Sequence, residues 1–112
     1  MNNSILNISD ISDNNPSICI PRVSIKYNKH FISSIFKPLK LGDIYRIDMI
    51  SYYTKDKQSY NRVFIHFNHW YNNFNSIKTR LLLDNYKYIK VIYDKPWFWK
   101  CLKSRLPRPN IT

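Results

Sequence analysis

Side chains that could bind a metal ion are few in this chain, and their spacing does not suit that task. The cysteines, Cys19 and Cys101, form no Cys-x-x-Cys pair. His66 and His69 are three residues apart in a stretch that alternates like a strand, so they point to opposite sides. His30 lies far away in a predicted helix. The spacing therefore predicts neither a metal site nor a bound cofactor.

The sequence also lacks the patterns of common catalytic sites. Glutamate does not occur in it, and we find neither a glycine-rich phosphate loop nor a nucleophile elbow. Asp48 lies beside Arg46, a spacing that favours a surface ion pair over an acid–base pair. One nearby carboxylate cannot hold two metal ions for a nuclease reaction. We therefore predict that the chain is not an enzyme.

Its charge points instead to a binding function. The chain has 18 lysines and arginines against 7 aspartates, which gives a net charge of +11. A folded domain this basic favours polyanions such as nucleic acid, while a basic surface that only keeps the protein soluble is the alternative. No apolar run approaches the roughly 20 residues of a membrane span. We expect a soluble protein of a reducing compartment that does not bind membranes.

Hydrophobic periodicity predicts the elements that would position the binding residues. Strands are expected where β-branched and aromatic residues alternate with polar ones, and helices where apolar residues recur every three to four positions. Asn28 is the predicted N-cap of the first helix, and Asn72 or Asn73 that of the second. The predicted strands are 17–25, 43–53, 60–70 and 86–94, and the predicted helices are 28–39 and 72–84.

The same periodicity predicts which side chains face the core. In the helices these are Phe31, Ile32, Ile35 and Phe36, and then Phe74, Ile77, Leu81 and Leu82. In the strands they include Val63, Ile65 and Phe67, and Ile89, Val91 and Tyr93. In the second strand Tyr45, Ile47 and Met49 share one face, and Ile44, Arg46 and Asp48 share the other.

The order β-α-β-β-α-β predicts an α+β protein with a ferredoxin-like split βαβ fold. Its four strands would form an antiparallel sheet in the order 4-1-3-2, with both helices on one face. We expect a flexible tail at residues 1–15, the folded domain at residues 16–100 and a basic, proline-containing tail at residues 101–112. That last tail is either solvated or laid along phosphates.

The stretch "YNRVFIHF", residues 60–67, resembles the signature strand of the RNA recognition motif. In that family the first and third strands lie side by side, and aromatic residues on their open face stack on bases. Phe64 falls at a stacking position and matches, whereas Arg62 stands at a second stacking position and Asn61 at the usual glycine. In the first strand Cys19 stands where the family has an aromatic residue.

The wider chain resembles small RNA-recognition-motif-like proteins of giant DNA viruses, a mimivirus-like group. The similarity rests on "IPRV", "RIDM", "RVFIHF" and "YDKPWFWK", which occur in that order between residues 17 and 100. This resemblance implies the same fold and a place in the host cytoplasm, the viral factory or the virion. It says less about activity than about fold.

The resemblance and the charge together predict that the sheet face binds nucleic acid, RNA or another single strand. Arg62 and Phe64 would form the centre of the site, and its supporting residues would be Tyr60, His66, Arg46 and Lys90. Binding should depend on salt because phosphate contacts would dominate. The alternatives are a sheet face covered by the C-terminal segment or by a partner, and nonspecific DNA binding.

The segment "PWFW" is the second candidate site. Trp97, Phe98 and Trp99 cannot all face inward if they form a strand. They could bind a protein partner or a second copy of the chain, because tryptophan is enriched at binding hot spots. Alternatively, a tryptophan folds back over the open sheet face, or the two tryptophans close the core.

Overall fold

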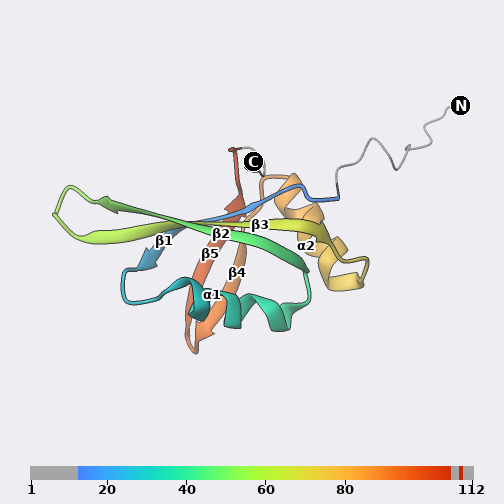
Figure 1. Cartoon of the computed structure of the whole chain (residues 1–112), viewed down its shortest axis with the longest axis horizontal. Helices are drawn as coiled ribbons and strands as arrows, with labels where there is room; N and C mark the ends of the chain where they lie inside the picture. The colour runs from blue at the N-terminus through green and yellow to red at the C-terminus, as the bar shows by residue number, and fades with distance from the viewer. Residues whose placement is uncertain (1–12, 107–108, 110–112) are drawn as a thin grey trace, which may run out of the picture.

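Five strands and two α-helices make up the computed structural model, which describes residues 13–106 and residue 109. The strands form one open antiparallel sheet in the order β2-β3-β1-β5-β4 (Figure 1). The predicted α+β class is therefore confirmed. In chain order the elements are β1 (Ile18–Ser24), α1 (Lys29–Phe36), the 3-10 helix η2 (Lys37–Leu39), β2 (Gly42–Tyr53), β3 (Ser59–Trp70), α2 (Phe74–Asp84), β4 (Ile89–Asp94) and β5 (Trp97–Lys103).

The fifth strand is the main difference from the predicted sheet of four. After β4 the chain turns between Asp94 and Trp97 and returns as β5, which pairs with both β4 and β1. β5 thus lies beside β1, in the place that the order 4-1-3-2 gives to the fourth strand, and β4 lies at the edge. The ferredoxin-like prediction is confirmed in part, for β1, α1, β2 and β3. The boundary predicted after residue 100 falls inside β5.

The hairpin of β4 and β5 joins the rest of the sheet over a short distance. β1 and β5 pair at two positions, Ile18 with Lys103 and Cys19 with Leu102. Beyond this junction the hairpin runs steeply across the direction of the long β2 and β3 strands (Figure 1). The sheet is therefore strongly twisted, and its two parts curve around the core.

Irregularities in the ladders set which side chains face inward. Tyr45 is an extra residue on β2, because Ile44 pairs with Phe67 while Arg46 pairs with the adjacent His66. Ile44 therefore joins Ile47 and Met49 at the core, and the predicted grouping of Tyr45 with those two residues is wrong. In β1 a similar irregularity lies between Ile20 and Val23, where it accommodates Pro21, which lacks an N–H donor.

One hydrophobic core lies between the sheet and the helices. The central strands β1 and β3 contribute fully buried aliphatic residues, as their alternation predicts. Both helices reach the same core, so both lie against the same face of the sheet. The main core residues are Ile18, Ile20, Val63, Ile65 and Phe67 from the central strands, Ile32 and Phe36 from α1, Leu83 from α2, and Val91 and Trp99 from the hairpin.

The aromatic residues at the α1 end of the core surround Trp99. Its ring stacks on Tyr93 with centroids 4.4 Å apart and lies parallel to Phe36 at 6.3 Å. Tyr27 and Phe31 meet the same ring edge-on. Trp99 therefore fixes the β4–β5 hairpin against α1, because its ring touches both elements.

The two helices begin as predicted but bury different kinds of side chain. The side chains of Asn28 and Asn73 accept a hydrogen bond from the backbone N–H three residues on, each at 2.8 Å. α1 buries Ile32 and Phe36, in line with its apolar stripe. The buried residues of α2 are Ser76 and Leu83. The predicted stripe of α2 is exposed instead, so that prediction is wrong for Phe74, Ile77, Leu81 and Leu82.

Hydrogen bonds to the segment after η2 explain why α2 turns Ser76 inward. The Ser76 hydroxyl donates to the carbonyl of Leu41 at 2.6 Å, and the Asn73 amide donates to the carbonyl of Lys40 at 2.8 Å. Ser76 lies on the face of α2 opposite Phe74 and Leu81, and Asn73 holds the N-terminus of the helix. These polar contacts set the rotation of the helix about its axis.

The single glycine, Gly42, lies where β2 begins close to β3. A Cβ atom at this position would lie 2.5 Å from the carbonyl oxygen of His69 and 2.8 Å from a ring carbon of Phe67. The backbones of the two strands could not approach this closely with any other residue.

Residues 1–12, 107–108 and 110–112 of the two predicted tails lie outside the described residues. Residues 13–16 are held by hydrogen bonds. Trp70 donates its backbone N–H to the carbonyl of Asp13 at 2.7 Å and its indole N–H to the carbonyl of Pro16 at 3.0 Å. Arg80 of α2 donates to the carbonyl of Asn15 at 2.6 Å. The described part of the predicted N-terminal tail is therefore bound to the domain.

Candidate nucleic-acid interface

The face of the sheet that points away from the helices, here called the open face, carries the predicted binding residues. A cross-strand row runs through Asp48, Phe64, Cys19 and Leu102, from β2 to β5. Arg62 and Tyr60 follow Phe64 at alternate positions of β3. The strands therefore bring side chains from distant parts of the sequence onto one surface.

A hollow of about 450 Å³ lies on this face and is called the sheet hollow. Its size falls within the range of pockets that bind small ligands, such as a single nucleotide. A second hollow of about 550 Å³ shares three of its lining residues and is also lined by Ser104. The sheet hollow is lined by Cys19, Pro21, Arg62, Phe64, Tyr86, Leu102, Lys103, Arg105 and Leu106.

The two central residues of the predicted site both line the sheet hollow, but they differ in exposure. Arg62 is exposed, whereas Phe64 is only 7% exposed. Phe64 lies parallel to the His66 ring with centroids 6.4 Å apart. It can form the floor of the hollow, but it cannot offer a whole ring face to a base as the resemblance implies.

Cys19 shares the floor of the hollow and is half-buried. Burial raises the pKa of its thiol, and the nearby Arg62 guanidinium offsets part of that rise. The thiol is therefore neutral at physiological pH and contributes a small apolar surface rather than a reactive thiolate.

Two arginines stack on tyrosines beside the hollow, toward the tip of the β2–β3 hairpin. The guanidinium carbon of Arg22 lies 4.4 Å from the ring centre of Tyr60, and that of Arg62 lies 5.4 Å from the ring centre of Tyr52. The two tyrosine rings are 6.1 Å apart. Stacked guanidinium groups present flat, charged surfaces that can contact a base or a phosphate.

Three lysines lie over aromatic rings on the other side of the hollow, along β4 and β5 and the segment before them. Lys90 lies over Phe98 at 4.8 Å, Lys100 over Tyr88 at 4.5 Å, and Lys103 over Tyr86 at 5.3 Å. Lys103 also contacts Asp84 at 3.5 Å. Pairs of cations and aromatic rings thus flank the sheet hollow on both sides.

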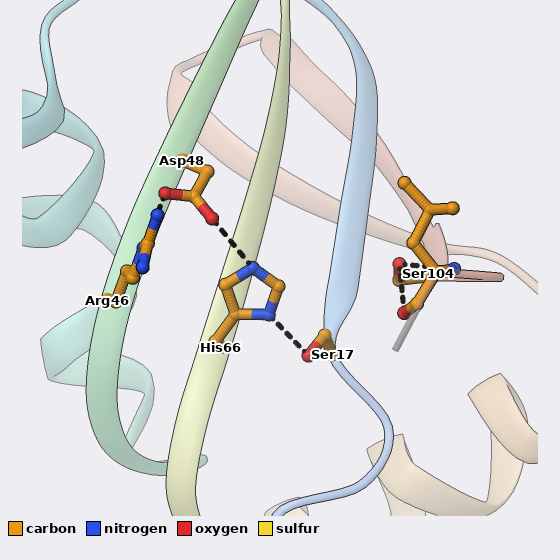
Figure 2. A network of polar contacts seen from close by, with 6 residues as sticks. Ser17, Arg46, Asp48, His66 and Ser104 are labelled. Atoms are coloured by element: carbon orange, nitrogen blue, oxygen red, sulfur yellow. Dashed lines mark hydrogen bonds and ion pairs between the residues drawn. The ribbon is translucent and has the colours of Figure 1, made fainter. Parts of the chain in front are cut away.

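His66 takes part in a polar network that joins β3 to β2 and to Ser17, the residue just before β1 (Figure 2). Its Nε2 lies 3.1 Å from the Asp48 carboxylate, and its Nδ1 lies 2.6 Å from the Ser17 hydroxyl. An ionised carboxylate only accepts hydrogen bonds, so Nε2 donates to Asp48, and in the neutral ring Nδ1 accepts from Ser17. Arg46 donates to the other carboxylate oxygen at 2.7 Å.

Burial pushes the pKa of Asp48 upward, but the hydrogen bonds and charges of Arg46 and His66 outweigh it. The pKa of Asp48 therefore lies below its ordinary value, and the carboxylate is charged at neutral pH. The predicted surface pair of Arg46 with Asp48 is present in the structure.

The serine, histidine and aspartate of this network resemble a hydrolase triad in residue types only. Ser17 and His66 are each 3% exposed, so a substrate carbonyl cannot reach the hydroxyl. The network instead links β2 and β3 to Ser17, the residue just before β1, and holds Asp48 and Arg46 in place. His66 can act on the interface through these neighbours and not by direct contact.

The structure separates the three aromatic residues of the "PWFW" segment. Trp97 is 64% exposed and Phe98 is also exposed, whereas Trp99 is 3% exposed. The Trp99 ring lies in the core, as one of the alternatives expected, so a partner could contact only Trp97 and Phe98 of this segment directly. Phe98 pairs with the exposed Ile92 of β4 and lies under Lys90.

The interface also contains residues outside the predicted site, namely Arg22, Tyr52, Tyr86 and Leu106, together with Lys103 and Arg105 of the tail that the sequence placed either in solvent or along phosphates. The position of Tyr52 on the open face could have been predicted, because Tyr52 lies four residues after Asp48 in β2 and therefore on the same face of the strand. Lys103 and Arg105 were assigned to the tail after residue 100, so the prediction did not place them on the sheet face.

Among the described residues, no group of three histidine, cysteine or aspartate side chains could hold a metal ion. In the same part of the chain, no helix is long and apolar enough to cross a membrane. Comparisons of the chain with protein-family models, with curated proteins and with solved structures give no match. The resemblance to the RNA recognition motif therefore stays a prediction.

Proposed function

We propose that this protein is a non-enzymatic domain that binds single-stranded RNA through the open face of its sheet. The observation that carries the proposal is the sheet hollow, whose apolar floor of Cys19, Phe64 and Leu102 is bordered by cations. An apolar floor suits a base, and Arg62, Lys103 and Arg105 can bind the phosphates on either side of it. The resemblance to the RNA recognition motif implies the same activity.

Phosphate contacts should dominate the affinity. An exposed stacking platform is worth about 1–3 kcal/mol per base, and the near-complete burial of Phe64 removes most of that gain. The cation–aromatic pairs remain available on both sides of the hollow. We therefore expect modest affinity that falls steeply with salt, by about 0.7 in the logarithmic slope for each phosphate neutralised.

Fluorescence anisotropy with a labelled single-stranded RNA of about 12 nucleotides tests this proposal. Arg62→Ala combined with Arg105→Ala removes two cations of the sheet hollow, both on exposed side chains. We expect the affinity at about 50 mM salt to fall by about tenfold or more, and the salt slope to become shallower.

The matched control removes two exposed lysines from the helix side, Lys29→Ala with Lys37→Ala. This control should lower the affinity by less than about threefold, because long-range charge acts weakly in salt. Equal losses in both double variants would mean that only net charge matters. No binding by the unmodified protein would refute the proposal, and a preference for duplex DNA would replace RNA as the ligand.

The exposed tip of the β4–β5 hairpin favours a second function, binding of a protein partner or a second copy. Trp97, Phe98 and Ile92 are all exposed there, and large apolar side chains of this kind are typical of binding hot spots. Light scattering after size-exclusion chromatography tests self-association. A dimer that is lost in Trp97→Ala but kept in Arg62→Ala would support this second function, and a monomer at all concentrations would exclude the dimer.

A further inference from the structure

The outer face of α2 is an apolar surface that nothing in the described structure covers. It consists of Phe74, Ile77, Lys78, Leu81, Leu82 and Asn85, which with Lys87 line a hollow of about 650 Å³. Phe74 is 78% exposed and Leu81 is 59% exposed. Apolar residues gathered in this way on one helix face mark a surface that binds another segment.

The described N-terminal residues approach this helix. The carbonyl of Asn15 accepts a hydrogen bond from Arg80 at 2.6 Å, and the carbonyl of Asp13 accepts one from Trp70, just before α2. Arg80 lies three residues from Ile77, so the two are neighbours on the helix surface. The N-terminal residues, drawn in blue, run past α2 in Figure 1. The chain before Asp13 therefore starts at the border of the outer face.

The composition of residues 1–12 suits that face. The segment contains Ile5, Leu6, Ile8 and Ile11, and its one charged side chain, Asp10, is opposite in sign to Lys78 and Lys87. Eight residues before Asp13 can span up to about 27 Å, whereas the outer face from Phe74 to Leu82 is about 13 Å long. The segment can therefore reach all of the face.

We propose that residues 1–12 dock on the outer face of α2, with their isoleucines and leucine in its hollow. A tethered segment has an effective concentration in the millimolar range, so even weak apolar contacts favour the docked state. A second copy of the chain is a poorer occupant, because each copy has a net charge of +11 and two copies repel each other. The proposal does not depend on RNA binding.

Photo-cross-linking in the full-length chain tests the docking. Replacing Ile8 with p-benzoylphenylalanine places a light-activated group in the segment, and mass spectrometry then identifies its partners. We expect cross-links within one chain to the peptide that holds Ile77, Leu81 or Leu82. The same group in place of Tyr53, which is exposed at the end of β2, should give no cross-links to α2.

A variant of the helix face gives the decisive comparison. Leu81→Asp introduces a charge on an exposed position, so the domain should still fold, and the cross-link yield should fall about tenfold. Circular dichroism confirms folding, and Ile77→Asp serves as a second variant. Cross-links between two chains would make a second copy the occupant, and cross-links elsewhere, or an unchanged yield in both variants, would also overturn the proposal.

Discussion

α1 and α2 were both predicted to bury an apolar stripe, but they attach to the domain in different ways. α1 places Ile32 and Phe36 in the core, where Phe36 lies parallel to Trp99. α2 is held by hydrogen bonds from Ser76 and Asn73, while most of its apolar residues face outward. The difference shows that an apolar stripe identifies a helix but does not decide which face is buried, because a few polar anchors can set its rotation.

The largest loss of stability should come from removing a buried side chain by which α1 packs into the core. Phe36→Ala removes a buried ring that contacts Trp99, so the free energy of unfolding should fall by about 3–5 kcal/mol. Leu81→Ala on the outer face of α2 should cost less than about 1 kcal/mol. Urea unfolding followed by circular dichroism measures both. Similar losses of unfolding free energy in the two variants would mean that both helices are held by buried apolar side chains.

Leu83 is the one fully buried apolar residue among those described in α2, and it should show the next largest effect. Leu83→Ala leaves a cavity beside the core and should cost about 2–4 kcal/mol. The adjacent Leu82→Ala should cost under about 1 kcal/mol, because that side chain lies partly in solvent. Thermal unfolding of both variants checks this, and a larger loss for Leu82→Ala would reverse the orientation of α2 described here.

The polar anchor of α2 should have an intermediate effect. Ser76→Ala removes the hydrogen bond to the carbonyl of Leu41 and should cost about 1–2 kcal/mol. The control is Ser34→Ala in α1, where an exposed hydroxyl donates to the carbonyl of Phe31 in its own helix. That change should alter stability by less than about 0.5 kcal/mol. Equal effects in a urea titration would show that Ser76 is not an anchor.

The polar network of Asp48, His66 and Arg46 should contribute to stability in a pH-dependent way, unlike the hydrogen bonds that hold α2. The pKa of Asp48 is lowered in the folded state, so its contribution is present above the ordinary value of 3.8 and is lost as the pH falls. Asp48→Asn should therefore lower stability by about 1 kcal/mol at pH 7. The difference from the unmodified protein should therefore shrink as the pH falls below 3.8. Urea unfolding across this range would contradict the account if the difference stayed constant.

The smallest effect should come from the ion pair between α2 and β5. Asp84 and Lys103 are 3.5 Å apart and both are substantially exposed. Asp84→Ala should change the free energy of unfolding by less than about 0.5 kcal/mol, because exposed ion pairs contribute little. The acidic residue also lies at the end of a helix, where a negative charge is unfavourable. A loss above about 1 kcal/mol in thermal unfolding would make this pair an additional anchor of α2.

Much of the fold follows from local patterns in the sequence. Asn28 and Asn73 begin the helices as predicted, and Val63, Ile65 and Phe67 face the core as their alternation indicates. The faces of β2 could not be predicted, because the irregularity at Tyr45 shifts the alternation and depends on how β2 pairs with β3. Local patterns specify an element, whereas its register and rotation depend on contacts with distant residues.

β5 could have been recognised from the sequence. Trp97, Trp99 and Cys101 alternate with Phe98, Lys100 and Leu102, and this alternation is typical of a strand. The interface was only partly predictable because β5, which was not predicted, forms part of its surface. Arg62 and Phe64 were identified from β3, but the exposure of Phe64 and the contribution of Arg105 depend on how the returning strand completes the surface.

Gly42 has a consequence for how this gene can change. Every single-base substitution that replaces a glycine gives a residue with a Cβ atom or a stop codon, and that atom would lie 2.5 Å from the backbone oxygen of His69. The obstacle is main chain and not a side chain that could rotate away. Position 42 should therefore accept almost no amino-acid replacement, although a substitution such as Gly42→Ala adds only one methyl group to the protein.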